Sequence, residues 1–136
     1  MYKSIVVAID INHADRGKDI IKKGKSLLDS GGDLHLIYVM PSIPTYAQTY
    51  LPADILAQNQ QDASAKLHAL ARADNVQANI EVRDGHPSDE VLNFAEEAKA
   101  DLIVVASHHP GLTDYLIGST AGRVVRHAQC SVLVDR

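Results

Sequence analysis

The residues with the clearest chemical potential lie in the last third of the chain. There an apolar run, Leu102 to Ala106, is followed by a loop and then by a helix start rich in hydroxyls. Unpaired amides at a helix N-terminus carry the positive end of the helix dipole, and glycine lets an anion approach the backbone. The pattern predicts a phosphate-binding site before a catalytic one. Its residues are Ser107, His108, His109 and Gly111 in the loop, and Gly118, Ser119 and Thr120 at the helix start.

Asp10 is the one acidic residue at the end of a predicted strand. A carboxylate there can accept hydrogen bonds from a base or ribose, or share Mg²⁺ with phosphate oxygens. The alternative is an N-cap for the following helix, a role for which Asn12 competes. Ser119 and Thr120 have the same alternative as helix caps, and a capping hydroxyl can coexist with a bound anion because free amides lie beside it.

Four histidines fall at or just after predicted strand ends: His13, His86, His108 and His109. They predict a solvated, phosphate-binding or pH-responsive rim, because histidine titrates near neutrality. Metal ligation is disfavoured, since adjacent His108 and His109 would point apart and no cysteine or acid stands at ligand spacing.

Common catalytic patterns are disfavoured. Ser107 and His108 are neighbours in an extended segment, so their side chains face opposite ways, and no G-x-S-x-G elbow surrounds them. The stretch Ser30 to Asp33 is similar to the phosphate loop of ATP pyrophosphatases, but it closes a predicted helix instead of opening one. Neither G-x-x-x-x-G-K-S/T nor G-x-G-x-x-G is present.

The elements that must position these residues are buried strands and amphipathic helices in alternation. Continuous apolar runs are typical of strands covered on both faces, as in a parallel sheet. A further strand, near Gln77 to Arg83, alternates polar and apolar residues and is predicted at an exposed edge. The buried strands are predicted at Ser4 to Ile9, Leu34 to Met40, Leu102 to Ala106 and Ser131 to Val134.

Four helical patterns separate these strands, which gives the order βαβαβαβαβ and predicts an open, doubly wound α/β sheet. Ligands of such sheets bind at the carboxyl ends of the strands. Gly31 and Gly32 are predicted to stop the first helix, and Pro87 to start the third. The apolar helix faces are Ile20, Gly24, Leu27 and Leu28; Leu56, Ala63, Leu67 and Leu70; Val91, Ala95 and Ala98; and Ala121, Val124, Val125 and Ala128.

One segment, Pro41 to Pro52, has no periodicity and contains Tyr46 and Tyr50. Connections of this length are often lids or contact loops, and the alternative is a surface excursion without a role.

Composition narrows the class of protein. A chain of 136 residues suits one compact domain, 1–136, and its net charge of -4 disfavours binding to nucleic acid or an anionic membrane surface. No stretch approaches the roughly 20 apolar residues of a membrane span, and Asp10 interrupts the first apolar run, so no signal peptide is expected. We therefore expect a cytoplasmic protein in which the single cysteine, Cys130, packs as a small hydrophobe.

Five separated motifs, in order along the whole chain, resemble the universal stress protein family. The loop at Ala106 and the residues before the last strand are similar to the F type of that family. The motifs are Val7 to Asp10, Ile37 to Pro41, Ala106 to His108, Tyr115 to Ser119, and Val124 to Val134.

The resemblance implies an α/β fold of the adenine nucleotide alpha hydrolase type, with a parallel five-stranded sheet in the order 3-2-1-4-5 and helices on both faces. It also implies a homodimer joined through the last strand, Val132, Leu133 and Val134. An apolar edge strand at this position needs a partner or a cover, which supports the dimer.

The resemblance further implies binding of ATP, or of ADP or AMP, with Mg²⁺. The matching residues are Gly118 and Ser119 for phosphates, Asp10 for the nucleotide and as candidate Mg²⁺ ligand, and the backbone of Val39 for adenine. Ala106 and His109 replace the two earlier glycines of the family motif, and Gly111 can supply the lost flexibility. The full predicted site is Ala8, Ile9, Asp10, Val39, Ala106, Ser107, His108, His109, Gly111, Gly118, Ser119, Thr120 and Ala121.

Three functions follow as hypotheses. The first is a dimeric, ATP-binding module of the stress response that regulates an unidentified protein partner, without efficient catalysis, because no residue is placed to activate water. The second is a slow ATPase or self-phosphorylating enzyme in which Asp10 helps to hold Mg²⁺ and Ser119 or Thr120 accepts phosphate. The third is a dimeric scaffold that binds no nucleotide.

Overall fold

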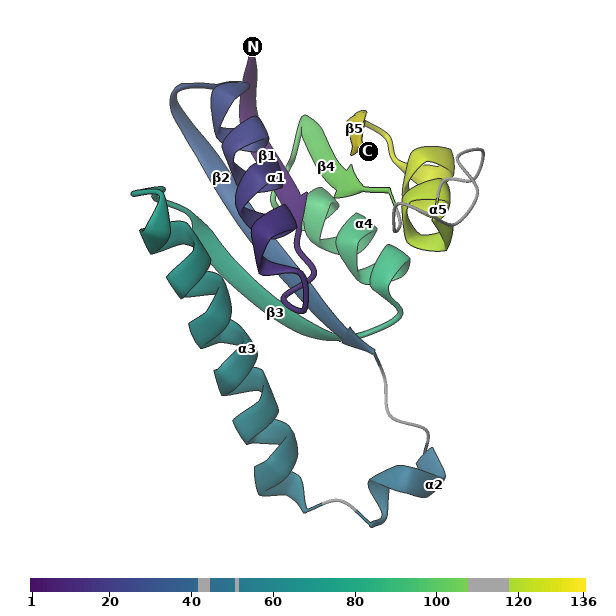
Figure 1. The fold of residues 1–136 in the computed structure, drawn as a ribbon. Coiled ribbons are helices and arrows are strands. Elements are labelled where there is room, and N and C mark those ends of the chain that lie inside the picture. Colours follow the sequence, from purple (N-terminus) through teal and green to yellow (C-terminus); the bar gives the residue numbers. More distant parts are fainter. Residues whose placement is uncertain (42–44, 51, 108–117) are drawn as a thin grey trace.

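The computed structural model describes residues 1–41, 45–50, 52–107 and 118–136. Its five parallel strands form one sheet in the order β3-β2-β1-β4-β5, which confirms the predicted fold. The strands are β1 Tyr2–Ala8, β2 Leu28–Pro41, β3 Asn79–Gly85, β4 Leu102–Ala106 and β5 Ser131–Asp135. The helices are α1 Ala14–Ser26, α2 Thr45–Gln48, α3 Ala53–Ala73, α4 Pro87–Glu97 and α5 Ser119–His127 (Figure 1).

The sheet is buried on both faces, and Figure 1 shows α1 in front of it and α4 behind. Alternate residues of β1 divide between the two cores: Ile5 and Val7 pack with α1 and α3, whereas Val6 packs with α4 and α5. Because every inner strand position contacts one of these layers, the strands read as continuous apolar runs. The prediction that helices cover both faces is confirmed.

A glycine lies at the contact between α1 and the sheet. A Cβ atom at Gly24 would stand 2.9 Å from Cγ2 of Val7, which is fully buried. The absence of a side chain at position 24 therefore sets the distance between α1 and β1. That spacing also fixes where the first turn of α1 stands relative to the strand ends.

The structure corrects the prediction that Gly31 and Gly32 stop the first helix. The helix ends at Ser26, and β2 begins at Leu28 and runs through both glycines. Gly31 has a φ of +80°, which favours glycine, and it lies where the register between β1 and β2 shifts. Leu27 and Leu28 consequently lie beyond the helix instead of on its buried face.

Four other predictions, on Val125, Pro87, the edge strand and Cys130, meet different outcomes. Val125 is 45% exposed, because α5 buries Ala121 and Val124 and the next residue is rotated away from the sheet. Pro87 does begin α4, and β3 does form an edge of the sheet, as predicted. Cys130 is partly buried against the α4–α5 core, where burial raises the pKa of its thiol.

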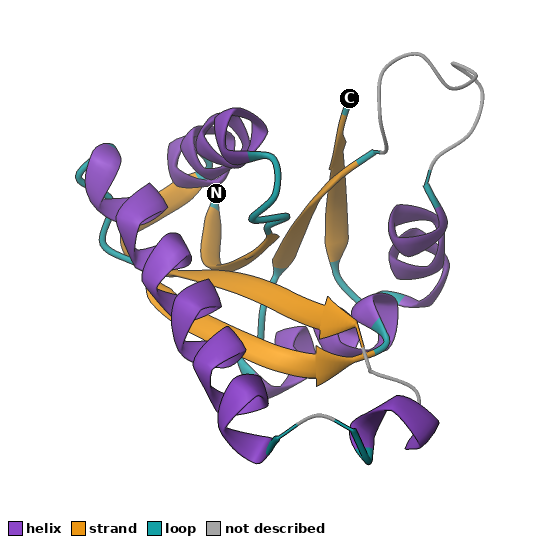
Figure 2. Cartoon of the chain, turned by 60° about the horizontal axis from the view of Figure 1, so that its bottom comes forward, coloured by secondary structure: helices purple, strands orange, loops and turns teal. Residues whose placement is uncertain are grey.

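The segment Pro41 to Pro52 lies partly outside the described residues. Its described part contains the short helix α2, and both Tyr46 and Tyr50 are highly exposed. Beyond it, α3 projects past the ends of the strands (Figures 1 and 2), and its buried residues all lie between Ala63 and Ala71.

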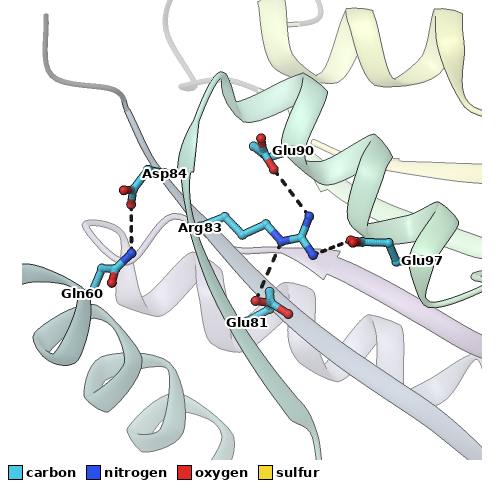
Figure 3. A network of polar contacts seen from close by, with 6 residues as sticks. All are labelled: Gln60, Glu81, Arg83, Asp84, Glu90 and Glu97. Carbon is cyan, nitrogen blue, oxygen red and sulfur yellow. Dashed lines mark hydrogen bonds and ion pairs between the residues drawn. The ribbon is translucent and has the colours of Figure 1, made fainter. Parts of the chain in front are cut away.

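The β3 edge is covered by charged side chains (Figure 3). Arg83 lies 5.0 Å from the ring centre of Phe94 and forms ion pairs with Glu81, Glu90 and Glu97. Two of these carboxylates belong to α4, so the network ties that helix to the edge strand. Charges of this kind also discourage pairing of the edge with another strand.

The amino ends of β1 and β4 are closed by hydrogen bonds. The carboxylate of Asp101 accepts hydrogen bonds from the backbone amides of Lys3 and Ser4, each at 3.0 Å, and these bonds lower the pKa of Asp101. The hydroxyl of Ser4 donates to the carbonyl of Ala98 at 3.1 Å.

Among the described helices, none has both the length and the apolar content needed to cross a membrane.

Candidate functional site

A cavity of about 910 Å³ opens where β1, β2 and β4 end and where α1, α4 and α5 begin. This is the position at which open parallel sheets bind ligands. Ten of the predicted residues line it, whereas His108, His109 and Gly111 lie outside the described residues. The ten are Ala8, Ile9, Asp10, Val39, Ala106, Ser107, Gly118, Ser119, Thr120 and Ala121.

Asp10 is exposed at the mouth of the cavity, directly after β1. Its Oδ1 accepts a hydrogen bond from the amide of Asn12 at 3.0 Å, and its Oδ2 lies 3.7 Å from Nε2 of His13. The N-cap of α1 is His13, and within the described ranges this helix has no side-chain cap. The alternative that Asp10 or Asn12 is the N-cap is therefore wrong, because the chain makes a turn at Asp10 before the helix begins.

Ser107 fixes the start of the loop that follows β4. The residue is 9% exposed, and its amide donates to the carbonyl of Asp135 at 2.7 Å. This bond continues the pairing of β4 with β5 by one residue. The Ser107 position is thus held by the end of the edge strand.

The start of α5 leaves backbone donors on the cavity side. Gly118 is the N-cap, with φ of -54° and ψ of 157°, and Ser119 is the first helical residue. Ser119 and Thr120 are therefore not caps, contrary to the alternative weighed above. The amides of the first helical turn have no partner within the helix, so they remain available to an anion in the cavity.

The opposite wall is apolar and comes from β2. Val39 is 8% exposed, and Ile37 accepts a hydrogen bond from the amide of Ile9 at 2.9 Å, which holds β1 and β2 together beside the cavity. Tyr38 also lines the wall. Burial and the nearby carboxylate of Asp10 raise the pKa of its phenol.

Sequence reasoning missed most of the wall made by the first turn of α1 and by α4. Sequence reasoning placed candidate ligand contacts mainly at strand ends. The residues of this wall belong to the starts of α1 and α4, and Pro87 and Val91 were assigned only to a helix and its apolar face. The one available signal was position along the chain, because α1 follows β1 and α4 follows β3 directly. The missed residues include Asn12, Asp15, Arg16 and Gly17 of the α1 region, and Pro87 and Val91 of α4.

The predicted histidine rim is only partly assembled. His13 lines the cavity, but His86 does not: its Nδ1 lies 3.0 Å from Oγ of Ser88 and 3.8 Å from Oδ2 of Asp89. Within the part of the chain that the structure describes, no three His, Cys, Asp or Glu side chains gather as metal ligands. Asp10 and Asp15 both bring exposed carboxylates to the cavity, and a carboxylate there suits Mg²⁺ shared with phosphate oxygens.

Known proteins resemble this chain over its full length. The sequence profile of the Universal stress protein family matches residues 1–136. Universal stress protein G of Salmonella typhimurium is 31% identical, with all of both chains covered. Universal stress protein MJ0531 of Methanocaldococcus jannaschii is 32% identical, covering 98% of this chain and 82% of that protein.

Solved structures share the fold. The structure of protein MJ0577 has a TM-score of 0.81 at 21% identity, covering 99% of this chain and 96% of the other. A universal stress protein in complex with cAMP has a TM-score of 0.56 at 23% identity, covering 99% and 97%. The one from Archaeoglobus fulgidus in complex with dAMP has a TM-score of 0.60 at 17% identity, covering 99% and 98%. Together with the match of the family profile to all 136 residues, these likenesses show that the chain belongs to the universal stress protein family.

Proposed function

We propose that this chain binds an adenine nucleotide, ATP in the first place, and acts as a dimeric regulatory module of the cytoplasmic stress response. The observation that carries the proposal is the meeting of three features in one cavity: the apolar wall at Val39, the carboxylate of Asp10, and the free amides at the start of α5. In the same order, these three features suit an adenine ring, a ribose and a phosphate chain.

Each part of the nucleotide has a partner in the chain under this proposal. The base lies against β2, where the backbone of Val39 hydrogen-bonds its edge, and the ribose lies near Asp10. The phosphates lie between Ser107 and the helix start at Gly118, where backbone amides and the helix dipole favour negative charge. The carboxylate of Asp10 would hold Mg²⁺, which would partly neutralise the charge of the phosphates.

Two structural relatives support the class of ligand. A universal stress protein has been solved with cAMP and another with dAMP, and both ligands contain adenine and phosphate. We propose ATP instead of these monophosphates because the cavity, at about 910 Å³, has room for a larger ligand.

The dimer part of the proposal rests on β5. This strand lies at the edge of the sheet, and β4 is its one neighbour among the described strands. Val132, Leu133 and Val134 pack partly against both cores, so the edge is held rigid while its outer backbone groups remain available to a second copy.

Two measurements test this proposal. Titration calorimetry with ATP in the presence of Mg²⁺ should show one site per chain, and no binding at millimolar ATP would contradict nucleotide binding. Sedimentation velocity over a range of protein concentrations should give twice the chain mass of 14.7 kDa. A monomer at every concentration would contradict the dimer and leave the nucleotide site to be judged by calorimetry alone.

A further inference from the structure

Arg16 stands out among the residues that line the cavity. Of the described lining residues, it is the one lysine or arginine, whereas Asp10 and Asp15 contribute two carboxylates. A polyphosphate entering this cavity therefore meets one permanently charged cation, supplied by the first turn of α1.

The guanidinium of Arg16 lies at the end of the cavity that adjoins β4 and β5. Its Nη2 donates to the carbonyl oxygen of Asp135 at 3.3 Å, and the amide of Ser107 donates to the same oxygen at 2.7 Å. The two donors thus share one acceptor and lie side by side. Ser107 is in turn the residue at which the predicted phosphate region begins.

The adenine side of the cavity lies far from this cation. In the order β3-β2-β1-β4-β5, Val39 belongs to β2, and Asp135 belongs to β5, three strand spacings away. With strands roughly 4.8 Å apart, that separation is roughly 14 Å. A ligand whose base lies at Val39 reaches Arg16 only through a chain of several phosphates.

Arg16 has donors to spare for such a ligand. A guanidinium carries five N–H donors, and the structure gives this one a single, rather long hydrogen bond. None of the ion pairs found among the described residues involves Arg16, although Lys22 and Lys23 of the same helix each pair with an aspartate. Its other side borders a second hollow of about 530 Å³, so the half-buried side chain has space to turn.

We propose that Arg16 makes the pocket select adenylates by the number of their phosphates, favouring ATP over ADP and ADP over AMP. The inference rests on the proposed function, because it assumes that adenine occupies the Val39 side. The cation binds the terminal phosphates with charge-assisted hydrogen bonds, and AMP is too short to reach it. Affinity for adenosine and AMP therefore depends on the rest of the pocket and not on Arg16.

The experiment compares ATP, ADP, AMP and adenosine by calorimetry, at constant Mg²⁺ and salt, in the wild-type chain and in Arg16→Gln. The variant should bind ATP about tenfold more weakly than the wild type does. Its loss of affinity for ADP should be smaller, and its affinities for AMP and adenosine should change by less than about twofold. Arg16→Lys, which keeps the charge, should recover part of the loss.

Lys18→Gln is the matched control, because it removes one charge from the same turn of α1 at a residue that does not line the cavity. It should leave the order of affinities unchanged. Unaltered adenosine binding in Arg16→Gln shows that the variant is folded. An equal loss for all four ligands, or an unchanged preference for ATP, would overturn the inference while leaving the pocket assignment intact. A wild-type chain that binds none of the four would overturn the proposed function itself, and this inference with it.

Discussion

At the amino ends of β1 and β4, the side chain of Asp101 accepts hydrogen bonds from the backbone amides of Lys3 and Ser4. The backbone donors at this end of the sheet are thus satisfied within the protein. At the carboxyl ends of the same strands, the amides beside Gly118 face a cavity, and no side chain among the described residues caps the helix. Hydrogen-bonding groups that a protein satisfies internally add to stability, whereas groups left open serve binding. One sheet therefore divides stability and ligand binding between its two ends.

The substitution Gly118→Val should show the largest difference between an effect on ligand binding and an effect on stability. The φ of Gly118 is -54°, which valine adopts readily, but its side chain would block the approach of phosphate to the helix start. We expect ATP affinity to fall by about 100-fold, measured by calorimetry, with the thermal midpoint lowered by only a few degrees, because valine is a poorer N-cap than glycine.

Gly122→Val is the matched control one turn further along α5. A Cβ atom at Gly122 meets open space, and the residue does not line the cavity. This variant should bind ATP like the wild type. Equal affinities for the wild type and Gly118→Val would instead show that phosphate does not bind at this helix start.

The converse change is Asp101→Ala at the closed end. It removes the acceptor of two backbone amides, so we expect the free energy of unfolding to fall by about 2 kcal/mol in urea titrations, while ATP affinity stays the same. The pKa of Asp101 is lowered in the folded state, so its contribution is complete above the ordinary value of 3.8 and is lost as the pH falls through the folded value.

Asp33→Ala, at an exposed carboxylate of β2, is a control for the loss of one negative charge. It should change stability by less than about 0.5 kcal/mol. A variant at Asp101 that lost ATP binding without losing stability would contradict the division between the two ends.

The smallest effect concerns His35, on the face of β2 that packs against α4. Its ring meets Phe94 edge-on, with ring centres 5.6 Å apart, and burial lowers the pKa of the imidazole despite the opposing effect of Asp33. The unfolded chain therefore binds the proton more tightly. Protonation of His35 should therefore cost no stability above pH 6.5, and the free energy of unfolding should decline as the pH falls below that value.

His35→Phe should flatten that decline. Denaturant titrations of the wild type and the variant between about pH 7.5 and 5.5 provide the comparison, and the wild type should lose more stability than the variant toward the acid end. Parallel stability curves for the two proteins would show that His35 is not the group responsible.

The sequence predicted the framework well because the strands carry their signal locally. The run Leu102 to Ala106 is β4 as predicted, and β5 differs by one residue. The error at Gly31 has a non-local cause: whether a glycine pair ends a helix or bends a strand depends on the register with β1, which the local pattern does not contain.

The site was partly predictable for the same reason. Asp10, Val39 and Ser107 could be placed because each follows or ends a strand, and strand ends meet at one edge. Arg16 could not be placed in this way. Its role at the cavity depends on the rotation of α1, and on the close approach of that helix which Gly24 allows. Sequence spacing alone does not give that rotation.

The length of α3 has a consequence for local dynamics. Its first ten residues, 53–62, contribute nothing to the core, whereas Leu67 is fully enclosed. A short helix without packing is marginal in water, so amide protons of that half should exchange with deuterium through fraying of its outer turns. Those around Leu67 should exchange only when the whole fold opens, which would make one continuous helix report two protection levels.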